Sequence, residues 1–341
     1  MKRPVRTALA TTLAATLAAL VAGCATTPPP ATEASVQAHI AAAEAAAGKD
    51  YPEYLGLCKP APVKRPEAGS IDLAALIARP APPPGAAFDN LAYVGSAWVS
   101  AWALKTSDGV ILIDALNTVD EVDRLIVPGL KSQGLSPSDV KTVLVTHGHG
   151  DHYGGADHVK ALAGATKPRV VMSALDWTMT ATQLEFASPI WPAPPKIDRA
   201  RDVSAQDGDL LRQGDTTVKL VVTPGHTLGT LSPVFDVRSG GRSYKALVWG
   251  GTSFNFGRDM QRLDAYIAAA DRMRELARTE NIEVLLSNHP ANDLTVKRLA
   301  AMKANPAMAN PFVIGNAGVL RTLTVISECA KANRDRFAMM P

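Results

Sequence analysis

The sequence has few cysteines, few aromatic residues and almost no net charge. Three of its 341 residues are cysteines, and Phe, Trp and Tyr together make up 5%. Basic and acidic residues number 35 and 32, so the chain lacks the strongly basic balance of nucleic-acid-binding domains. Hydrophobic residues make up 47%, and a chain of this length can bury a sizeable core. We expect a globular domain that acts on a small molecule and not on nucleic acid.

The most apolar run near the start of the chain is too short to predict a transmembrane helix. This run, residues 8–22, is rich in alanine and interrupted by threonine, which does not suit a membrane span. Three basic residues precede it, namely Lys2, Arg3 and Arg6. A basic start followed by a short apolar run is typical of a signal peptide, which we predict over residues 1–23.

The end of this segment, Leu20-Val21-Ala22-Gly23-Cys24, resembles the lipobox of bacterial lipoproteins. In that case Cys24 becomes an acylated N-terminus, which anchors a protein without spanning the membrane. An ordinary secretory signal that contains a cysteine is the alternative. Ala25 follows, with no aspartate to suggest inner-membrane retention, so we expect a periplasmic protein anchored to the outer membrane through Cys24 only. Loss of residues 1–23 leaves 32 basic and 32 acidic residues, a formally neutral chain.

Residues 24–87 are predicted to be a tether and an N-terminal arm, and residues 88–341 the catalytic domain. Residues 25–35 contain three prolines and three threonines, a composition that favours a stiff spacer over a packed core. An alanine-rich helix is expected over residues 36–48. Residues 59–85 hold seven prolines and predict an extended arm along the domain.

Six consecutive residues, His147-Gly148-His149-Gly150-Asp151-His152, hold four side chains that can bind a metal ion. They follow a β-branched apolar run, residues 142–146, that predicts a buried strand. In an extended loop His147 and His149 point the same way, so they can meet one metal while Asp151 and His152 face a second. Four such groups on one short loop gain little from one another without a cation.

Each of these pairs lacks a third ligand, which two other histidines can supply. His226 lies in Pro224-Gly225-His226-Thr227 and His289 in Ser287-Asn288-His289-Pro290, each after an apolar run of strand character. A zinc site with three protein ligands leaves one position open for water. The remaining histidines, His39 and His158, lack this context and are interpreted as structural or surface residues.

The order of these motifs resembles that of the metallo-β-lactamase superfamily, over about residues 90–300. The resemblance implies an α/β fold, the αββα sandwich, with the metal site at one edge between two sheets. It also implies two zinc ions (Zn2+) per chain. His147, His149 and His226 would bind the first, and Asp151, His152 and His289 the second.

One turn separates the branches of this superfamily. Hydrolases such as glyoxalase II carry a metal-bridging aspartate there, where this chain reads Gly250-Gly251-Thr252-Ser253, with glycine in place of the aspartate. Many of the true β-lactamases have a cysteine in this turn, but subclass B3 has small hydroxyl residues, so the chain is most similar to subclass B3. Thr252 and Ser253 are candidates to bind a substrate carboxylate, although ordinary turn residues would look the same.

Trp191 is a further candidate for substrate binding. It lies near the centre of a proline-rich loop, residues 186–198, and loops on rigid scaffolds often carry binding residues. The loop either forms a lip over the metal cleft or covers a core tryptophan. Trp98 is a weaker candidate for the opposite lip, and core packing is its expected role.

The expected chemistry is hydrolysis. Zinc lowers the pKa of a bound water to about 7 and so provides hydroxide at neutral pH, and Asp151 is expected to hold and orient this nucleophile. The resemblance favours opening of the β-lactam ring of antibiotics, and hence antibiotic resistance. A lactonase or another ester or thioester hydrolase is the alternative. A non-catalytic zinc-binding envelope lipoprotein is disfavoured, because structural zinc sites are usually closed.

Three elements of the domain are predicted by pattern alone. A strand is expected over residues 98–105, and a helix that starts at Thr118 should kink or end at Pro128. Apolar residues at helical spacing predict an amphipathic helix over residues 261–278.

Two cysteines remain if Cys24 is acylated. Cys58 precedes the domain, and Cys329 lies in the last predicted helix. An oxidising compartment favours a bridge between them. Such a bridge would fasten the arm to the C-terminal helix.

Overall fold

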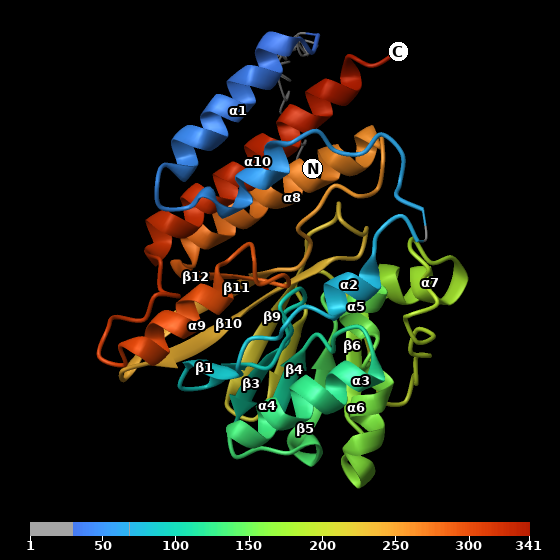
Figure 1. The fold of residues 1–341 in the computed structure, drawn as a ribbon, viewed down its shortest axis with the longest axis vertical. Coiled ribbons are helices and arrows are strands. Elements are labelled where there is room, and N and C mark those ends of the chain that lie inside the picture. The colour runs from blue at the N-terminus through green and yellow to red at the C-terminus, as the bar shows by residue number, and fades with distance from the viewer. Residues whose placement is uncertain (1–29, 68) are drawn as a thin grey trace, which may run out of the picture. The chain divides into compact units, whose positions relative to one another are not determined.

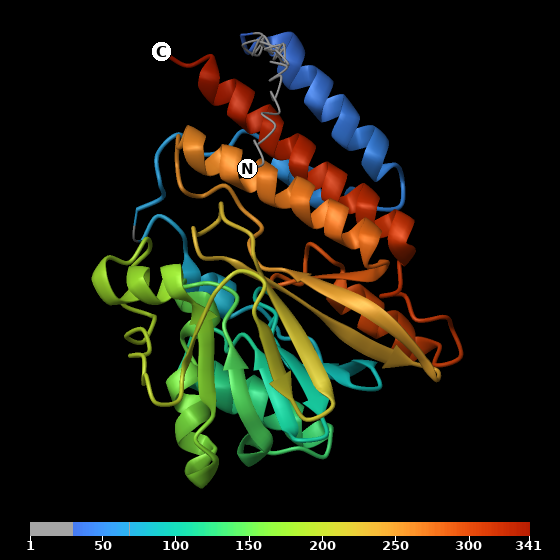
Figure 2. The same ribbon diagram turned by 180° about the vertical axis from the view of Figure 1, so that it is seen from behind.

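The computed structural model describes residues 30–67 and 69–341, which Figures 1 and 2 show as a ribbon. The predicted signal peptide and Cys24 lie outside these residues. No helix in the described ranges is long and apolar enough to cross a membrane. From residue 31 onward, the arm and the predicted catalytic domain form one compact unit.

The first sheet has seven strands that follow one another in sequence order. The pairs from β1 to β4 are antiparallel, and those from β4 to β7 are parallel. The predicted domain boundary at residue 88 lies inside β1. The strands are β1 (Gly85–Phe88), β2 (Leu91–Tyr93), β3 (Trp102–Thr106), β4 (Gly109–Ile113), β5 (Val140–Leu144), β6 (Arg169–Ser173) and β7 (Val203–Ala205).

The second sheet has five strands in the order β12-β11-β10-β9-β8. β11 and β12 are parallel, and the other pairs are antiparallel. Each of the three histidine-bearing loops follows a strand end: β5 in the first sheet, and β9 and β12 in the second. The strands are β8 (Leu210–Gln213), β9 (Thr216–Val222), β10 (Leu231–Ser239), β11 (Arg242–Trp249) and β12 (Ile282–Ser287).

The two sheets face each other, and helices cover both outer faces (Figures 1 and 2). Alternation along the strands builds these layers. In β4, Ile111 and Ile113 point into the core between the sheets, whereas Val110 and Leu112 pack under the helices on the other side. The predicted αββα sandwich is therefore confirmed.

Three long helices form the helical layer of the second sheet: α8 (Met260–Thr279) and α10 (Gly315–Ala338) pack on β12, and α1 (Glu33–Ala47) packs on α10. The amphipathic pattern predicted for α8 is observed, because Leu263, Met273 and Ala277 are all buried. The other helices and helical turns are η1 (Pro52–Cys58), α2 (Leu73–Ile77), α3 (Val119–Glu121), η2 (Val122–Ile126), α4 (Val127–Ser132), η3 (Pro137–Asp139), α5 (Gly150–Tyr153), α6 (Ala156–Leu162), η4 (Gly164–Thr166), α7 (Ala174–Thr182) and α9 (Thr295–Ala304).

Two predictions for the N-terminal part need correction. The helix predicted from residue 36 begins at Glu33, because the Thr32 hydroxyl accepts the Ser35 N–H and caps it. The tether predicted up to residue 35 is therefore helical over its last three residues. The arm predicted to be extended over residues 59–85 is not extended throughout, since residues 73–77 form a short helix.

Two predictions for the first sheet and its helices also differ from the structure. The strand predicted from Trp98 starts at Trp102, because the Ser96 hydroxyl accepts the Val99 N–H and holds a turn in front of it. The helix predicted to kink or end at Pro128 continues to Ser132. A π-helical turn, η2, precedes the proline, and Pro128 sits in the first turn of α4, where its missing N–H costs little.

Cys58 and Cys329 form a disulfide bond, as predicted. The bond joins η1 of the arm to α10. Asn333, one turn further along α10, adds to this link, because its amide donates to the Leu57 carbonyl and accepts the Ala61 N–H, each at 2.8 Å. The arm is thus fastened to the last helix by covalent and hydrogen bonds.

Candidate metal centre

The first group of predicted ligands converges on one point. His147 Nε2 lies 3.1 Å from His149 Nδ1 and 3.1 Å from His226 Nε2. All three rings are buried, and the third comes from the loop after β9. Nitrogen lone pairs that face one another at this distance repel unless a proton or cation lies among them. Three imidazoles are a common ligand set for Zn2+.

Two histidines of this group, His147 and His226, are set to be neutral. Burial, reinforced by the neighbouring histidines, lowers the pKa of His147 well below its usual value. The pKa of His226 is lowered in the same way, by burial and by His149. A neutral imidazole keeps the lone pair that a metal ligand needs, so these rings are ready to bind a cation without first losing a proton.

The side chains of the second group of predicted ligands are spaced more widely than those of the first. Asp151 and His152 join His147 in a buried cluster whose ligand atoms lie within 4.8 Å of one another. His152 Nε2 is 3.3 Å from Asp151 Oδ2 and has no hydrogen-bond partner. His289 Nε2 lies 3.8 Å from the same oxygen. The structure thus brings Asp151, His152 and His289 together around the Asp151 carboxylate.

Charge in the second group differs from that in the first. Burial opposes ionisation of Asp151, but the facing His152 and His289 outweigh it and hold the pKa of Asp151 well below its usual range. For His152, burial is outweighed by the carboxylates of Asp151 and Asp114, which raise its pKa to about 10. A cation that replaced the His152 proton would satisfy the same carboxylates.

In three of these histidines the ring nitrogen that faces away from the cluster is held by an oxygen. His152 Nδ1 lies 2.8 Å from Asp114 Oδ2, His226 Nδ1 2.9 Å from the Ser253 carbonyl, and His289 Nδ1 2.8 Å from the Trp98 carbonyl. These contacts fix each tautomer with the proton on Nδ1, so that Nε2 faces the cluster. Such outer contacts are typical of metal-binding histidines, and the residues present therefore fit a metal site.

Two aspartates that the sequence analysis did not single out position the loops. Asp114, directly after β4, accepts the Thr146 N–H at 2.7 Å as well as holding His152. Asp176, in α7, accepts the N–H groups of Gly148 at 2.8 Å and Gly229 at 3.1 Å. Asp176 thereby ties the His147–His152 loop to the loop of His226. A polar residue directly after a buried apolar strand is the one signal that would have indicated Asp114.

An ion pair between Arg262 and Glu185 contacts the first group of histidines. Arg262 of α8 donates to the Gly225 carbonyl at 2.6 Å and to the His226 carbonyl, and it pairs with Glu185 at 2.7 Å. Glu185 Oε2 also lies 3.6 Å from His149 Nε2. Burial opposes ionisation of Glu185, but His149 and Arg262 outweigh it and lower its pKa to about 2. No sequence pattern indicated either residue.

The metal-site residues open into a cleft of about 490 Å³. All three predicted substrate-binding residues, Thr252, Ser253 and Trp191, line it. Trp191 also donates its indole N–H to Asn117 Oδ1 at 3.0 Å, which fixes the loop as a lip. Trp98 also lines the cleft, and because it is half-buried and packs against the core under the helices of the first sheet, its predicted core packing is observed as well.

One wall of the cleft comes from the N-terminal arm. Ile71, Leu73, Leu76 and Arg79 line it, although none of the residues of α2 is buried. This contribution was not predicted, because the proline-rich arm gives no periodic signal. His39 and His158 lie elsewhere and pair with Glu328 and Asp123.

The turn after β11 places Thr252, and not Gly251, toward the cleft. A Cβ atom on Gly251 would lie 2.4 Å from Cβ of His226, so any side chain there would displace this candidate ligand. The position in the turn that can face the cleft is therefore that of Thr252. The turn carries no carboxylate or thiol at either position.

Parts of this chain are similar in sequence to proteins of known family. A sequence model described as the metallo-β-lactamase superfamily matches residues 99–239. Hydroxyacylglutathione hydrolases from two strains of Rhodopseudomonas palustris are 36% and 31% identical over 111 residues, 33% of this chain in each case. The match spans about a third of the length of these relatives (34%).

Solved structures match over a larger part of the chain. BJP-1, a subclass B3 metallo-β-lactamase of Bradyrhizobium japonicum, is 25% identical with a TM-score of 0.59, covering 74% of this chain and 94% of that one. A mutant of FEZ-1 from Legionella gormanii is 21% identical, with a TM-score of 0.62 and coverages of 73% and 94%. The class B3 di-zinc enzyme LRA-12 from an Alaskan soil metagenome is 20% identical, with a TM-score of 0.58 and coverages of 76% and 96%.

Proposed function

Since the chain belongs to the metallo-β-lactamase superfamily and is a hydrolase of that group, we propose that it binds two zinc ions and opens the ring of β-lactam antibiotics. The observation that carries this proposal is the small number of carboxylates that line the cleft. Asp151 is the one carboxylate among the described residues that line it, and the turn at residues 250–253 adds none. A bridging carboxylate would add negative charge between the metals. Its absence suits a reaction in which an amide nitrogen leaves with developing negative charge.

Bound zinc would supply a Lewis acid and lower the pKa of water at the site. His147, His149 and His226 would hold one ion, and Asp151, His152 and His289 the other. The Asp151 carboxylate, kept ionised by His152 and His289, would accept a hydrogen bond from the attacking water and orient it. Asp114 would hold His152 in the tautomer that ligation requires.

The walls of the cleft would select the substrate. Trp98, Trp191 and Phe186 offer aromatic surface to an apolar substituent and exclude water. Thr252 and Ser253 offer hydroxyl groups for a carboxylate on the fused ring. Arg79 adds a positive charge, and it takes no part in the ion pairs that nine other arginines form among the described residues. We assign the substrate carboxylate to Arg79 together with this turn.

A second candidate is hydrolysis of a lactone, ester or thioester. The similarity to hydroxyacylglutathione hydrolases over 111 residues favours it. Those relatives are matched over a third of their length only, and the turn lacks the carboxylate that the bridging role requires. The lactam reaction therefore remains the first proposal.

A direct test is a hydrolysis screen of the purified, zinc-loaded protein. The substrates are a chromogenic cephalosporin, a simple lactone, a glutathione thioester and a phosphodiester. We expect turnover of the cephalosporin. If the protein opens the lactone or the thioester and ignores every β-lactam, the second candidate replaces the first.

Arg79 permits a sharper test of substrate binding. Arg79→Ala should raise KM for a carboxylated cephalosporin about tenfold, which corresponds to about 1.4 kcal/mol, and leave its kcat unchanged. KM for the methyl ester of the same compound should not change. Lys64→Ala, in an exposed part of the arm that does not line the cleft, is the matched control. Equal effects on acid and ester would contradict a role in carboxylate binding.

We also propose that the protein works in the periplasm as a lipoprotein anchored through Cys24. The Leu20–Cys24 run supports this, and so does the disulfide between Cys58 and Cys329, because such bonds persist in oxidising compartments. Cys24→Ser should release active protein from the membrane fraction. Wild-type protein that is already soluble in the periplasm would contradict the anchor.

A further inference from the structure

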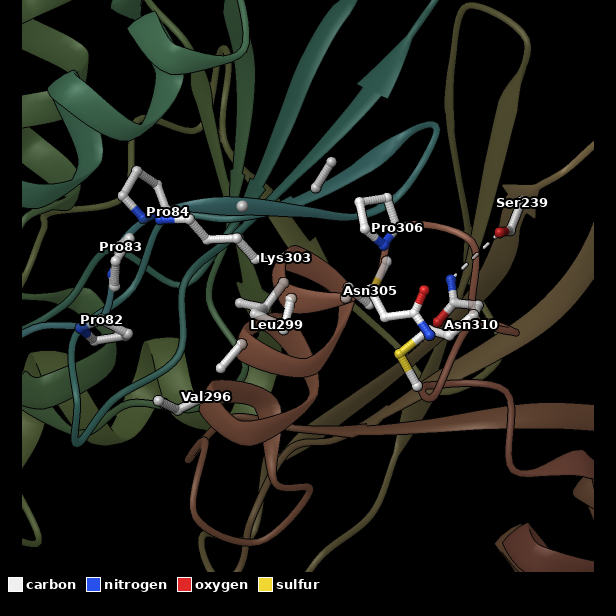
Figure 3. Close-up of a pocket in the computed structure, with 16 residues that line it drawn as sticks. Pro82, Pro83, Pro84, Ser239, Val296, Leu299, Lys303, Asn305, Pro306 and Asn310 are labelled. Atoms are coloured by element: carbon white, nitrogen blue, oxygen red, sulfur yellow. Dashed lines mark hydrogen bonds between the residues drawn. The ribbon is translucent and has the colours of Figure 1, made fainter.

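A second and larger cavity lies apart from the metal centre (Figure 3). Its volume is about 920 Å³, and none of the residues proposed to bind metal lines it. One wall is the arm where it enters β1, from Pro82 to Ala86, and the other is α9. The loop from Asn305 to Asn310 and Ser239 close one end. Ligand cavities in proteins typically measure about 300–1,000 Å³, so the space admits a sizeable molecule.

The long walls of this cavity offer apolar contact and few hydrogen bonds. Pro82, Pro83 and Pro84 have no backbone N–H to donate. Leu299 and Met302 face them from α9, and Leu299 packs so close to Gly85 that an added Cβ there would lie 3.3 Å from its Cδ2. Methionine side chains adapt to flexible apolar ligands. The walls therefore suit an alkyl chain.

Two of the polar groups of the cavity already have partners. Asn310 donates its amide to the Ala87 carbonyl at 2.7 Å, and its oxygen accepts the Phe312 N–H at 2.9 Å. Ser239 accepts from the same amide at 3.4 Å. These bonds hold the closing loop on β1 and leave little capacity for a ligand.

The one charged residue that lines the cavity is Lys303. Figure 3 shows its side chain reaching from α9 toward Pro84. The lysines that form ion pairs in the described part of the chain are Lys160, Lys219, Lys245 and Lys331, so Lys303 is without a carboxylate partner there. No acidic residue lines the cavity, and α9 contains none. The cavity thus joins a long apolar surface to a single positive charge.

From this combination we propose that the cavity binds one free fatty acid of medium or long chain. The alkyl chain lies between the prolines of the arm and α9, and its carboxylate pairs with Lys303. A carboxylate on the ligand would match the one charged group that lines the cavity, which is a cation without an ion-pair partner among the described residues. The site is separate from the metal centre and does not depend on which substrate is hydrolysed there.

Titration calorimetry with zinc-loaded, full-length protein and monomeric decanoate, dodecanoate and tetradecanoate tests the proposal. We expect one site per chain and a Kd that falls roughly fourfold per added methylene while the chain still fits. Dodecyltrimethylammonium, which carries the opposite charge, should not bind. Equal binding of both head groups would overturn the proposal, as would binding only to vesicles and not to monomers.

Three variants locate the ligand. Lys303→Glu should raise the Kd for dodecanoate at least tenfold, whereas Lys297→Glu, on the same helix but outside the cavity lining, should leave it unchanged. Ala300→Trp should fill the cavity and abolish binding. Equal effects of Lys303→Glu and Lys297→Glu would overturn the assignment of Lys303.

A fatty acid carboxylate can also bind zinc, so the metal centre needs its own control. Dodecanoate at its Kd should not inhibit turnover competitively, and His149→Ala should bind dodecanoate as wild type does. Competitive inhibition with an inhibition constant equal to the Kd, lost together with binding in His149→Ala, would place the ligand at the metal centre and overturn the proposal.

Discussion

The metal edge of the sandwich and the helical layer of α1, α8 and α10 both bury polar groups that are far apart in the sequence, but they use them differently. In the helical layer donors meet acceptors: Asn333 bonds to the Leu57 carbonyl and the Ala61 N–H, and Arg321 donates to the carbonyls of Ala46 and Ala47. At the metal edge His147, His149 and His226 turn nitrogens toward one another, and His152 Nε2 has no hydrogen-bond partner.

This difference indicates that the polar groups of the helical layer stabilise the fold, whereas those of the metal edge serve function. A buried polar group with a partner within the chain helps to fix the fold. A cluster that leaves its lone pairs facing one another is costly unless something else binds there. Changes at the metal edge should therefore remove activity and spare the fold, whereas changes in the helical layer should lower stability and spare activity.

The largest effect is expected from the ligands themselves. His149→Ala and His289→Ala should each lower zinc content below the roughly two ions expected per chain and abolish turnover. Metal analysis and steady-state kinetics measure this, with His158→Ala, which changes a surface histidine, as the control. Full activity in either variant would contradict the assignment of that ligand, and unfolding of both by circular dichroism would contradict the separation of site from fold.

A smaller effect is expected at Asp114, which contacts the proposed ligand His152. Asp114→Asn should lower metal affinity or turnover by about 10- to 100-fold, because the neutral amide no longer fixes the His152 tautomer. Asparagine tolerates the positive φ of 61° at this position, so the fold should survive. Asp202→Asn, which changes an aspartate that accepts the Val170 N–H far from the histidines, should leave metal binding unchanged; an equal loss in both variants would point to a general folding defect.

Removal of the disulfide should have the opposite effect to the ligand variants: it should lower stability and leave activity unchanged. Replacing both Cys58 and Cys329 with serine should lower the free energy of unfolding by about 2–4 kcal/mol, measured by denaturant titration. Zinc content and kcat should stay at wild-type values, because the bond lies in the helical layer. Loss of activity in the folded double variant would show that the arm also controls the cleft.

The smallest effect concerns acid stability of the same layer. Burial opposes ionisation of Glu328, but hydrogen bonds from Lys331 and His39 outweigh it and hold its pKa below the ordinary value of 4.5. A lowered pKa contributes stability above pH 4.5 that is lost as the pH falls through the folded value. Glu328→Gln should therefore cost less than about 1 kcal/mol at pH 7 and flatten the loss of stability below pH 4.5. An unchanged acid unfolding profile would contradict this.

The sequence allowed the convergence of the candidate metal-site residues to be predicted, because four of the six proposed ligands are consecutive or nearly so. His226 and His289 followed from the strand-like runs before them. Glu185 and Arg262 could not be predicted. Arg262 occupies a helix position that looks like an exposed charge, and it is buried only because α8 passes behind the His226 loop.

The fold was predictable for a similar reason, and its errors have physical causes. Apolar runs indicated the strands that precede the three histidine loops, and helical spacing indicated α8, whereas the arm residues at 71–79 gave no pattern. They line the cleft together with His289, Ala291 and Asn292, which lie over 200 positions further along the chain. Because the Ser96 hydroxyl holds a turn, β3 starts at Trp102, four residues after the start predicted at Trp98.

The bond between Cys58 and Cys329 has a topological consequence. The two residues are 271 positions apart, so the closed covalent loop contains both sheets and every proposed metal ligand. A protease that cuts once in any exposed turn inside this loop leaves two fragments that remain one molecule until the disulfide is reduced. A nicked enzyme would therefore keep its two pieces at high effective concentration and run as a single species on a non-reducing gel. The first cut would therefore not separate the proposed ligands on one fragment from those on the other.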